Sequence, residues 1–304
     1  MSEFRSDLAL EICHDLKRNH STLDGIECTV EKIGPLTVDR VHILTDEAAA
    51  LCEKPRGEYL TVSTGKLWLD DRDTFRDKVL SFAEILKPYL DVKERKSILV
   101  AGLGNRSITA DAIGPVAVRN LIVTRHIRTE RPAIFEELGL VDLCAFTPGV
   151  LGQTGIESAD MVRSIVDAVK PQLLVVIDAL ASRDPERLVT TVQIGNSGLQ
   201  PGSGIGNTRP SLSPEELHIP VLSIGVPTVV DAATLAADAI RRFSGIPFDA
   251  ATIREEWKKS ELNFFVTPKE TDQIIHVMGS FLAYGINLAL NEKISFEDML
   301  SLVG

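Results

Sequence analysis

Two aspartates each follow an apolar run in the sequence. Asp178 follows the five apolar residues of "LLVVID", and Asp111 follows the run "SILVAGL" after a short glycine-containing loop. If the two runs are neighbouring strands, their spacing of about 4.8 Å lets the two carboxylates approach closely. Two carboxylates in contact cannot both ionise readily, so the pKa of one rises and the pair can share a proton. Such a pair can hydrolyse a peptide bond, because one member takes a proton from the attacking water and the other donates one.

Each aspartate also has a purely structural interpretation. Asp111 precedes an apolar-periodic segment and could be a helix N-cap. Asp178 could be held by Arg183 or by nearby backbone groups. Three glycine-rich stretches likewise have a functional and a structural interpretation. Their N–H groups could bind a ligand, or the stretches could simply precede helices. These stretches are residues 147–157, 200–210 and 224–232.

The elements that would position these residues alternate between strand and helix in the middle of the chain. Unbroken apolar runs, typical of strands covered on both faces, occupy 97–104, 171–180 and 219–227. Amphipathic segments, which predict helices, occupy 111–127, 157–170 and 229–243. This alternation predicts an α/β fold with a mostly parallel sheet flanked by helices, in which both aspartates lie at the carboxyl edge of the strands.

The two ends of the chain extend this pattern. Runs rich in β-branched residues between 26 and 64 predict an N-terminal β-rich layer, and the apolar segment 269–290 predicts a long helix. We therefore expect a single α/β domain over 304 residues. Its parts are an N-terminal β-rich part at 1–95, a core at 96–245 and a C-terminal helical part at 246–304.

Composition and motifs exclude several classes of function. A net charge of -11 argues against a broad nucleic-acid surface, and neither a signal peptide nor a membrane-spanning run is predicted, so we expect a cytoplasmic protein. A dinucleotide fingerprint fails because Ser107 stands where a third glycine is needed. The GxSxG, HExxH and pepsin-type motifs are missing, and neither cysteines nor histidines have metal-ligand spacing. We expect no cofactor and no metal.

A series of uncommon blocks resembles the germination protease family of endospore-forming bacteria. In order they are "GLGN" followed by "DAIGP", then "NLIVTRH", "TPGVLGQTGIESAD", "VVIDALASR", "QIGNSGLQPGSGIGN" and "IPVLSIGVPTVVDA". The resemblance is dense over residues 97–243, and "RSDLALE" at 5–11 and "GEYLTVSTG" at 57–65 are weaker landmarks.

The resemblance implies an atypical aspartic endopeptidase that degrades small acid-soluble spore proteins at germination. It implies Asp111 and Asp178 as the catalytic acids, and we expect Asn105 and Arg183 to orient them or the substrate. The glycines Gly102 and Gly104 of the first block are expected to shape the site, and stretches 149–155 and 202–206 to line a cleft. The family's assembly implies a homotetramer.

The family also implies a fold like that of hydrogenase maturation endopeptidases, in which similarly placed acids bind a metal. Two alternatives follow: a metal-dependent maturation-type peptidase using the same acids, and a non-catalytic binding protein on this fold. Family members are typically made as zymogens. Here the "SDLA" block begins at Ser6, which leaves little to remove, and although Glu3 and Phe4 resemble a site that the family cuts, we do not expect autoprocessing.

Overall fold

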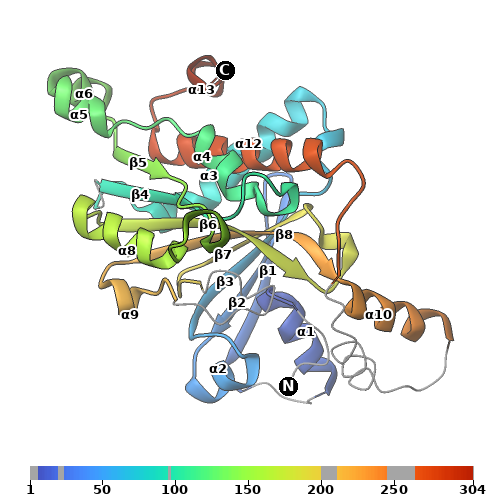
Figure 1. The fold of residues 1–304 in the computed structure, drawn as a ribbon. Helices are drawn as coiled ribbons and strands as arrows, with labels where there is room; N and C mark the ends of the chain where they lie inside the picture. The colour runs from blue at the N-terminus through green and yellow to red at the C-terminus, as the bar shows by residue number, and fades with distance from the viewer. Residues whose placement is uncertain (1–5, 20–23, 95–96, 200–210, 245–263, 304) are drawn as a thin grey trace.

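A computed structural model of the chain describes residues 6–19, 24–94, 97–199, 211–244 and 264–303. These residues form one mixed β-sheet with helices on both faces (Figure 1). The predicted α/β class is thereby confirmed.

The described sheet has nine strands in the order β1-β2-β3-β7-β8-β6-β4-β5, with β9 paired to β8. Strands β4, β5, β6 and β8 are parallel to one another, as expected for the apolar runs. The strands of the β-rich N-terminal part join them antiparallel through β3 and β7, and so extend the same sheet. The strands are β1 (Ile26–Ile33), β2 (Leu36–Ile43), β3 (Gly57–Ser63), β4 (Ser97–Gly102), β5 (Asp142–Phe146), β6 (Leu173–Ser182), β7 (Thr191–Gly195), β8 (Val221–Asp231) and β9 (Phe265–Val266).

The helices lie on the two faces and at the ends of this sheet (Figure 1). They are α1 (Ala9–Asn19), α2 (Asp46–Cys52), α3 (Arg72–Leu90), α4 (Ile113–Arg119), α5 (Arg125–Glu130), α6 (Pro132–Leu138), α7 (Leu151–Thr154), α8 (Ser158–Val169), α9 (Pro214–Leu217), α10 (Ala232–Ser244), α12 (Thr271–Leu290) and α13 (Phe296–Val303). Short 3₁₀ turns occur at η1 (Leu67–Leu69), η2 (Thr109–Asp111) and η3 (Pro185–Arg187).

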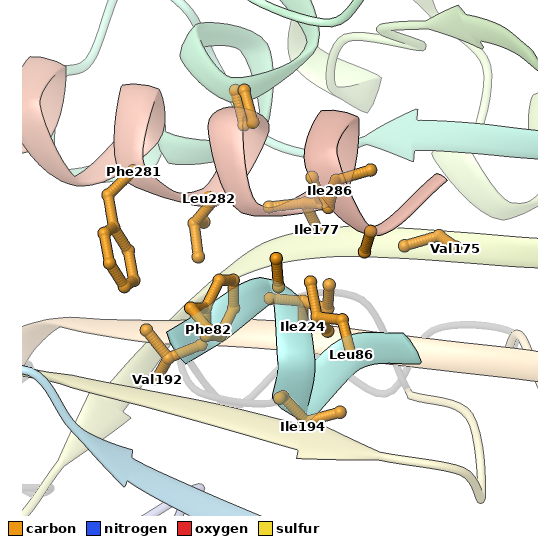
Figure 2. Packing of buried hydrophobic residues seen from close by; sticks show 14 of the residues in the cluster. Phe82, Leu86, Val175, Ile177, Val192, Ile194, Ile224, Phe281, Leu282 and Ile286 are labelled. Carbon is orange, nitrogen blue, oxygen red and sulfur yellow. The ribbon is translucent and has the colours of Figure 1, made fainter. Parts of the chain in front are cut away.

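One face of the sheet is covered by α3, α4 and α12. Because side chains alternate along a strand, Val175 and Ile177 of β6 point to this face and pack beneath the helices. Figure 2 shows Phe281 and Leu282 of α12 close to Phe82 of α3. By length and composition alone α12 resembles a membrane-crossing helix, but most of it is buried within the fold, as in a core helix.

Two separate groups of helices pack on the opposite face of the sheet. Helix α8 packs on the parallel strands, where Leu174 and Val176 of β6 belong to its apolar cluster. Helices α1 and α2 pack on β2 and β3. Asp178 continues the series of Leu174 and Val176 along β6, so it belongs to this second face.

Two predicted helices have different bounds in the structure. The helix predicted over 111–127 ends at Arg119, because Asn287 of α12 binds the main chain there: its Oδ1 accepts from the N–H of Ile122 at 3.0 Å and its Nδ2 donates to the C=O of Asn120 at 2.9 Å. The helix predicted from 229 begins at Ala232, because Val230 and Asp231 still belong to β8 and pair with β9.

Candidate functional site

Asp178 lies inside β6, at the point where the neighbouring strand β4 stops. Gly102, the last residue of β4, is the register partner of Ile177, and Asp178 itself pairs with Gly225 of β8. Its side chain is buried, and Oδ1 accepts a hydrogen bond from the N–H of Ala179 at 2.9 Å. The expectation that Asp178 lies at the carboxyl edge of its strand is wrong, since β6 runs on to Ser182 beside β8. The prediction that β4 and β6 are parallel neighbours is confirmed.

Asp111 lies in the loop that follows β4 and folds back toward the same place. The N–H of Leu103 donates to the C=O of Ile177 at 2.8 Å, which ties the start of this loop to the residue before Asp178. The η2 turn that contains Asp111 lies against β6 and β8. The half-buried Asp111 accepts through Oδ2 a hydrogen bond from the N–H of Asn105 at 2.7 Å. The N-cap position of α4 is Ala112, with no side-chain cap bond, so the N-cap interpretation of Asp111 is wrong.

Glycines make this return of the loop sterically possible. Gly104 has φ +110°, and a Cβ there would lie 2.0 Å from the C=O oxygen of Asp111 and 3.0 Å from its Oδ1. A Cβ at Gly102 would lie 2.4 Å from the oxygen of Gly114. A Cβ at Gly114 would in turn lie 2.3 Å from the oxygen of Leu103 and 2.7 Å from that of Ile177. Only residues without a Cβ let the start of α4 approach the end of β4 and the middle of β6 this closely.

Asn105 joins the Asp111 loop to one of the three glycine-rich stretches. Its Oδ1 accepts from Nε2 of Gln153 at 2.6 Å and from the N–H of Ser107 at 2.9 Å. Gln153 belongs to α7, within the stretch 147–157. This stretch therefore lies beside the Asp111 loop. The stretch 202–206, also expected to line a cleft, lies outside the described residues, as do Glu3 and Phe4.

Arg183 lies just beyond the end of β6. It is five residues after Asp178 on an extended chain, which places the two Cα atoms roughly 16 Å apart. Its N–H donates to Oε2 of Glu11 at 2.8 Å. The main chain of Arg183 is thus tied to α1, at the far end of the strand from the Asp111 loop.

The comparison with protein families decides the identity of this arrangement. The family described as germination protease matches residues 5–244. The chain is 39% identical to the germination protease of Clostridium perfringens strain 13, over 98% of each chain. It is 34% identical to that of Bacillus subtilis strain 168, over 97% of this chain and 95% of the other.

The chain belongs to the germination protease family. It is therefore a peptidase of the germination protease type, and the recognition made from the sequence blocks is confirmed. Among solved structures, a [NiFe] hydrogenase maturation protease, HycI, from Thermococcus kodakarensis is similar, with 17% identity, a TM-score of 0.38 and coverage of 68% of this chain and 98% of that one.

Two buried acids near the N-terminus of this germination protease family member were not predicted as site residues. Asp7 and Glu11 are both buried, and both contact the main chain of β6 or the residues directly after it. Burial raises the pKa of Glu11, against the opposing effects of hydrogen bonds from Ser6 and two main-chain N–H groups and of the nearby Arg187 charge. Their signal in the sequence was the "RSDLALE" block, two acids four residues apart around an apolar run.

A metal site would need several ligating side chains close together, and the same two aspartates could belong to one. Within the described ranges, no three His, Cys, Asp or Glu side chains are grouped so that they could hold a metal ion. The carboxylates of Asp111 and Asp178 are of a type that can bind a metal ion, and in the structure each accepts a hydrogen bond from a main-chain N–H.

Proposed function

We propose that this chain is an endopeptidase that hydrolyses small acid-soluble spore proteins at germination, with Asp111 and Asp178 activating water. Membership of the germination protease family supports the substrate class. The observation that carries the choice of residues is the return of the glycine loop after β4. That loop brings the turn containing Asp111 against β6, at the point where Asp178 emerges beyond the end of β4.

The proposed reaction needs one ionised and one protonated carboxyl group. The ionised carboxylate takes a proton from water as the water oxygen forms a bond to the peptide carbonyl carbon, and the protonated partner donates its proton to the carbonyl oxygen. The C–N bond of the resulting gem-diol then breaks as the first carboxyl group gives the leaving nitrogen the proton that it took from water. The second carboxylate takes a proton from one hydroxyl of the intermediate as the new C=O forms, so the pair again holds one proton. The main-chain N–H groups of Asn105 and Ala179 keep the two carboxylates in fixed orientations during these transfers.

The proposed roles of the neighbouring residues follow from their positions. Gly102 and Gly104 allow the close approach of the loop, and Asn105 holds Asp111 through its N–H while its side chain binds Gln153. For Arg183 we keep the prediction that its side chain orients the substrate. We also propose that the enzyme acts in the cytoplasm of the spore core as a homotetramer, which sedimentation velocity would detect as four times the chain mass of 33.2 kDa.

The decisive experiment digests a purified small acid-soluble spore protein with wild type, Asp111→Asn and Asp178→Asn, each with and without a chelator. Each variant is expected to lower kcat by about 10³-fold or more, as single losses in a cooperating catalytic set do. Asp73→Asn is the matched control, because this side chain is highly exposed at the start of α3 and is expected to keep wild-type kcat. Circular dichroism would establish that each variant is folded.

Different outcomes separate the alternatives. A folded Asp111→Asn or Asp178→Asn variant with the wild-type rate would refute the aspartate pair. Activity that disappears with the chelator and returns on adding a divalent ion would favour the metal-dependent peptidase. An intact spore protein under every condition, with wild-type enzyme, would favour the non-catalytic binding protein.

A further inference from the structure

One edge of β6 has no neighbouring strand beyond Asp178, among the residues that the structure describes. In a regular strand successive residues direct their N–H and C=O groups to opposite sides. The N–H of Leu174 donates to the C=O of Pro220, directly before β8, whereas the C=O of Ile177 accepts from the N–H of Leu103, directly after β4. Residues 179, 181 and 183 therefore turn their main-chain groups to the β4 side, where β4 has already ended at Gly102. Unpaired N–H groups at such a buried edge are costly unless another group accepts them.

Three carboxylates accept these N–H groups in succession. Asp178 Oδ1 accepts from Ala179 at 2.9 Å. Asp7 Oδ2 accepts from Ala181 at 2.8 Å, and the N–H of Asp7 donates back to the C=O of Ala181 at 2.9 Å. Glu11 accepts from the N–H of Arg183 at 2.8 Å. Aspartate and glutamate side chains thus take the place of a strand along this edge, in steps of two residues.

The segment that carries Asp7 is itself held next to the row of residues that contains Asp178. Asp178 pairs with Gly225 of β8, which pairs with Gln193 of β7, so the three lie side by side across the sheet. Oε1 of Gln193 accepts from the N–H of Ala9 at 2.7 Å, and its Nε2 donates to the C=O of Asp7 at 3.1 Å. The start of α1 therefore crosses the same face from which Asp178 projects.

A second set of contacts fixes Glu11. Its Oε1 accepts from the N–H of Asp184 at 3.1 Å and lies 3.4 Å from Nε of Arg187. The hydroxyl of Ser6 donates to Oε2. Asp7, Glu11, Asp178 and Gln193 are all less than a tenth exposed, which keeps water from replacing these hydrogen bonds.

We propose that Asp7 and Glu11 are positioning residues, which fix the free edge of β6 and through it the orientation of the Asp178 carboxylate. The proposal rests on the catalytic role of Asp178 stated above. Ala181 is two residues from the N–H that holds Asp178, so a shift of the strand at Ala181 moves Ala179 and its carboxylate partner. A displacement of this kind lowers the rate of the chemical step more than the binding of a long substrate, because a small misplacement is enough to remove the reactive geometry.

The test compares Asp7→Ala, Asp7→Asn and Asp71→Ala on a small acid-soluble spore protein. Asp7→Ala is expected to lower kcat by about 10- to 100-fold with KM within about twofold of wild type. Asp7→Asn keeps an oxygen acceptor for Ala181 and is expected to restore most of the loss. Asp71→Ala is the control: it also removes a bond from a carboxylate to a main-chain N–H, that of Thr74 at 2.8 Å, but at the start of α3, and should keep wild-type kcat.

A second measurement does not depend on activity. Amide hydrogen exchange at Ala179 and Ala181 is expected to speed up at least tenfold in Asp7→Ala and to stay at the wild-type rate in Asp71→Ala. If Asp7→Ala does not fold, Glu11→Gln, which keeps one oxygen acceptor, takes its place with an expected two- to tenfold loss of kcat.

The outcomes distinguish this proposal from the one on which it rests. A folded Asp7→Ala variant with wild-type kcat, or with unchanged exchange at Ala179, overturns the positioning role. Wild-type kcat in Asp178→Asn overturns the catalytic role of Asp178 instead, whatever Asp7→Ala does. An equal loss of kcat in Asp71→Ala also overturns the positioning role, because the effect would then be one of general stability.

Discussion

The face of the sheet under α12 and the free edge of β6 are stabilised in opposite ways. Under α12, buried apolar side chains from α3, α4 and the strands fill one continuous cluster. At the β6 edge, buried carboxylates accept main-chain N–H groups one by one. Apolar burial is non-directional and grows with area, whereas a hydrogen bond depends on distance and angle. The first region therefore supplies most of the stability, and the second fixes the positions of particular atoms.

Aromatic rings illustrate how the apolar cluster is built. The rings of Phe82 and Phe281 have centroids 4.8 Å apart, and Phe75 meets Phe281 edge-on at 6.1 Å (Figure 2 shows Phe82 and Phe281). Both Phe82 and Phe281 are fully buried. Such side chains can be lost only by opening a cavity, which costs free energy of unfolding but leaves the distant polar edge unchanged.

Removing a buried ring from the apolar cluster should destabilise the protein more than the other substitutions proposed below. Phe281→Ala is expected to lower the free energy of unfolding by about 3–5 kcal/mol, the usual cost of a buried Phe truncation. The kcat of the molecules that remain folded should match wild type. Urea denaturation measures the first quantity and active-site-normalised digestion the second. Leu302→Ala, at a side chain that is 62% exposed, is the control and should change neither. A loss of kcat in the folded fraction would contradict the separation of the two regions.

A substitution at Gly114, where the two regions meet, is expected to have a smaller effect on stability. Gly114→Ala places a Cβ 2.3 Å from the oxygen of Leu103 and 2.7 Å from that of Ile177, so α4 must move away from β4 and β6. We expect a loss of about 1–3 kcal/mol in the free energy of unfolding, as for overpacking, together with a fall in kcat.

The matched control for Gly114→Ala is Gly285→Ala. A Cβ at Gly285 would lie 2.4 Å from the ring of Phe82, in the apolar cluster under α12. It should also lower the free energy of unfolding, but should leave the kcat of the folded molecules at the wild-type value. If Gly114→Ala loses stability but keeps full kcat, the close approach of α4 serves packing alone.

Local patterns in the sequence predicted the buried strands of the sheet correctly. The run "LLVVID" predicted a buried strand because five consecutive apolar residues need cover on both faces, and β6 has it. The neighbouring strand β4 was found in the same way, and the two strands are parallel neighbours as predicted, although Asp178 lies inside β6 and not at its carboxyl end. The family blocks added the identity, which composition and periodicity did not contain.

Long-range contacts limited what could be predicted. Residues 111–127 have helical periodicity throughout, but Asn287, more than 160 residues away, takes the main-chain groups of Asn120 and Ile122 and the helix stops. Likewise nothing near Asp7 indicates that its partner is Ala181. Such pairings depend on the final packing of distant elements, which overrides local propensity.

The stability of the β6 edge is also expected to depend weakly on pH, through the carboxyl group of Glu11. Burial raises the pKa of Glu11 above its usual 4.5, so over a range beginning near pH 4.5 the native chain keeps a proton that the unfolded chain has lost. The contribution of this group to stability is therefore greatest below that range and is lost as pH rises through the native pKa. Hydrogen bonds from Ser6, Arg183 and Asp184 and the charge of Arg187 oppose this rise in pKa, so we expect a smaller effect on stability than that of the core substitutions.

Glu11→Gln tests this expectation because glutamine does not titrate. Relative to this variant, wild type should lose unfolding free energy as pH rises from 4.5, measured by urea denaturation at closely spaced pH values. Glu47→Gln, at an exposed position in the first turn of α2, should follow the wild-type curve. A constant difference between wild type and Glu11→Gln across the range would mean that the hydrogen bonds from Arg183 and Asp184 fully offset the cost of burying the charge. The carboxylates would then hold the β6 edge at no electrostatic cost, as the main chain of a neighbouring strand does.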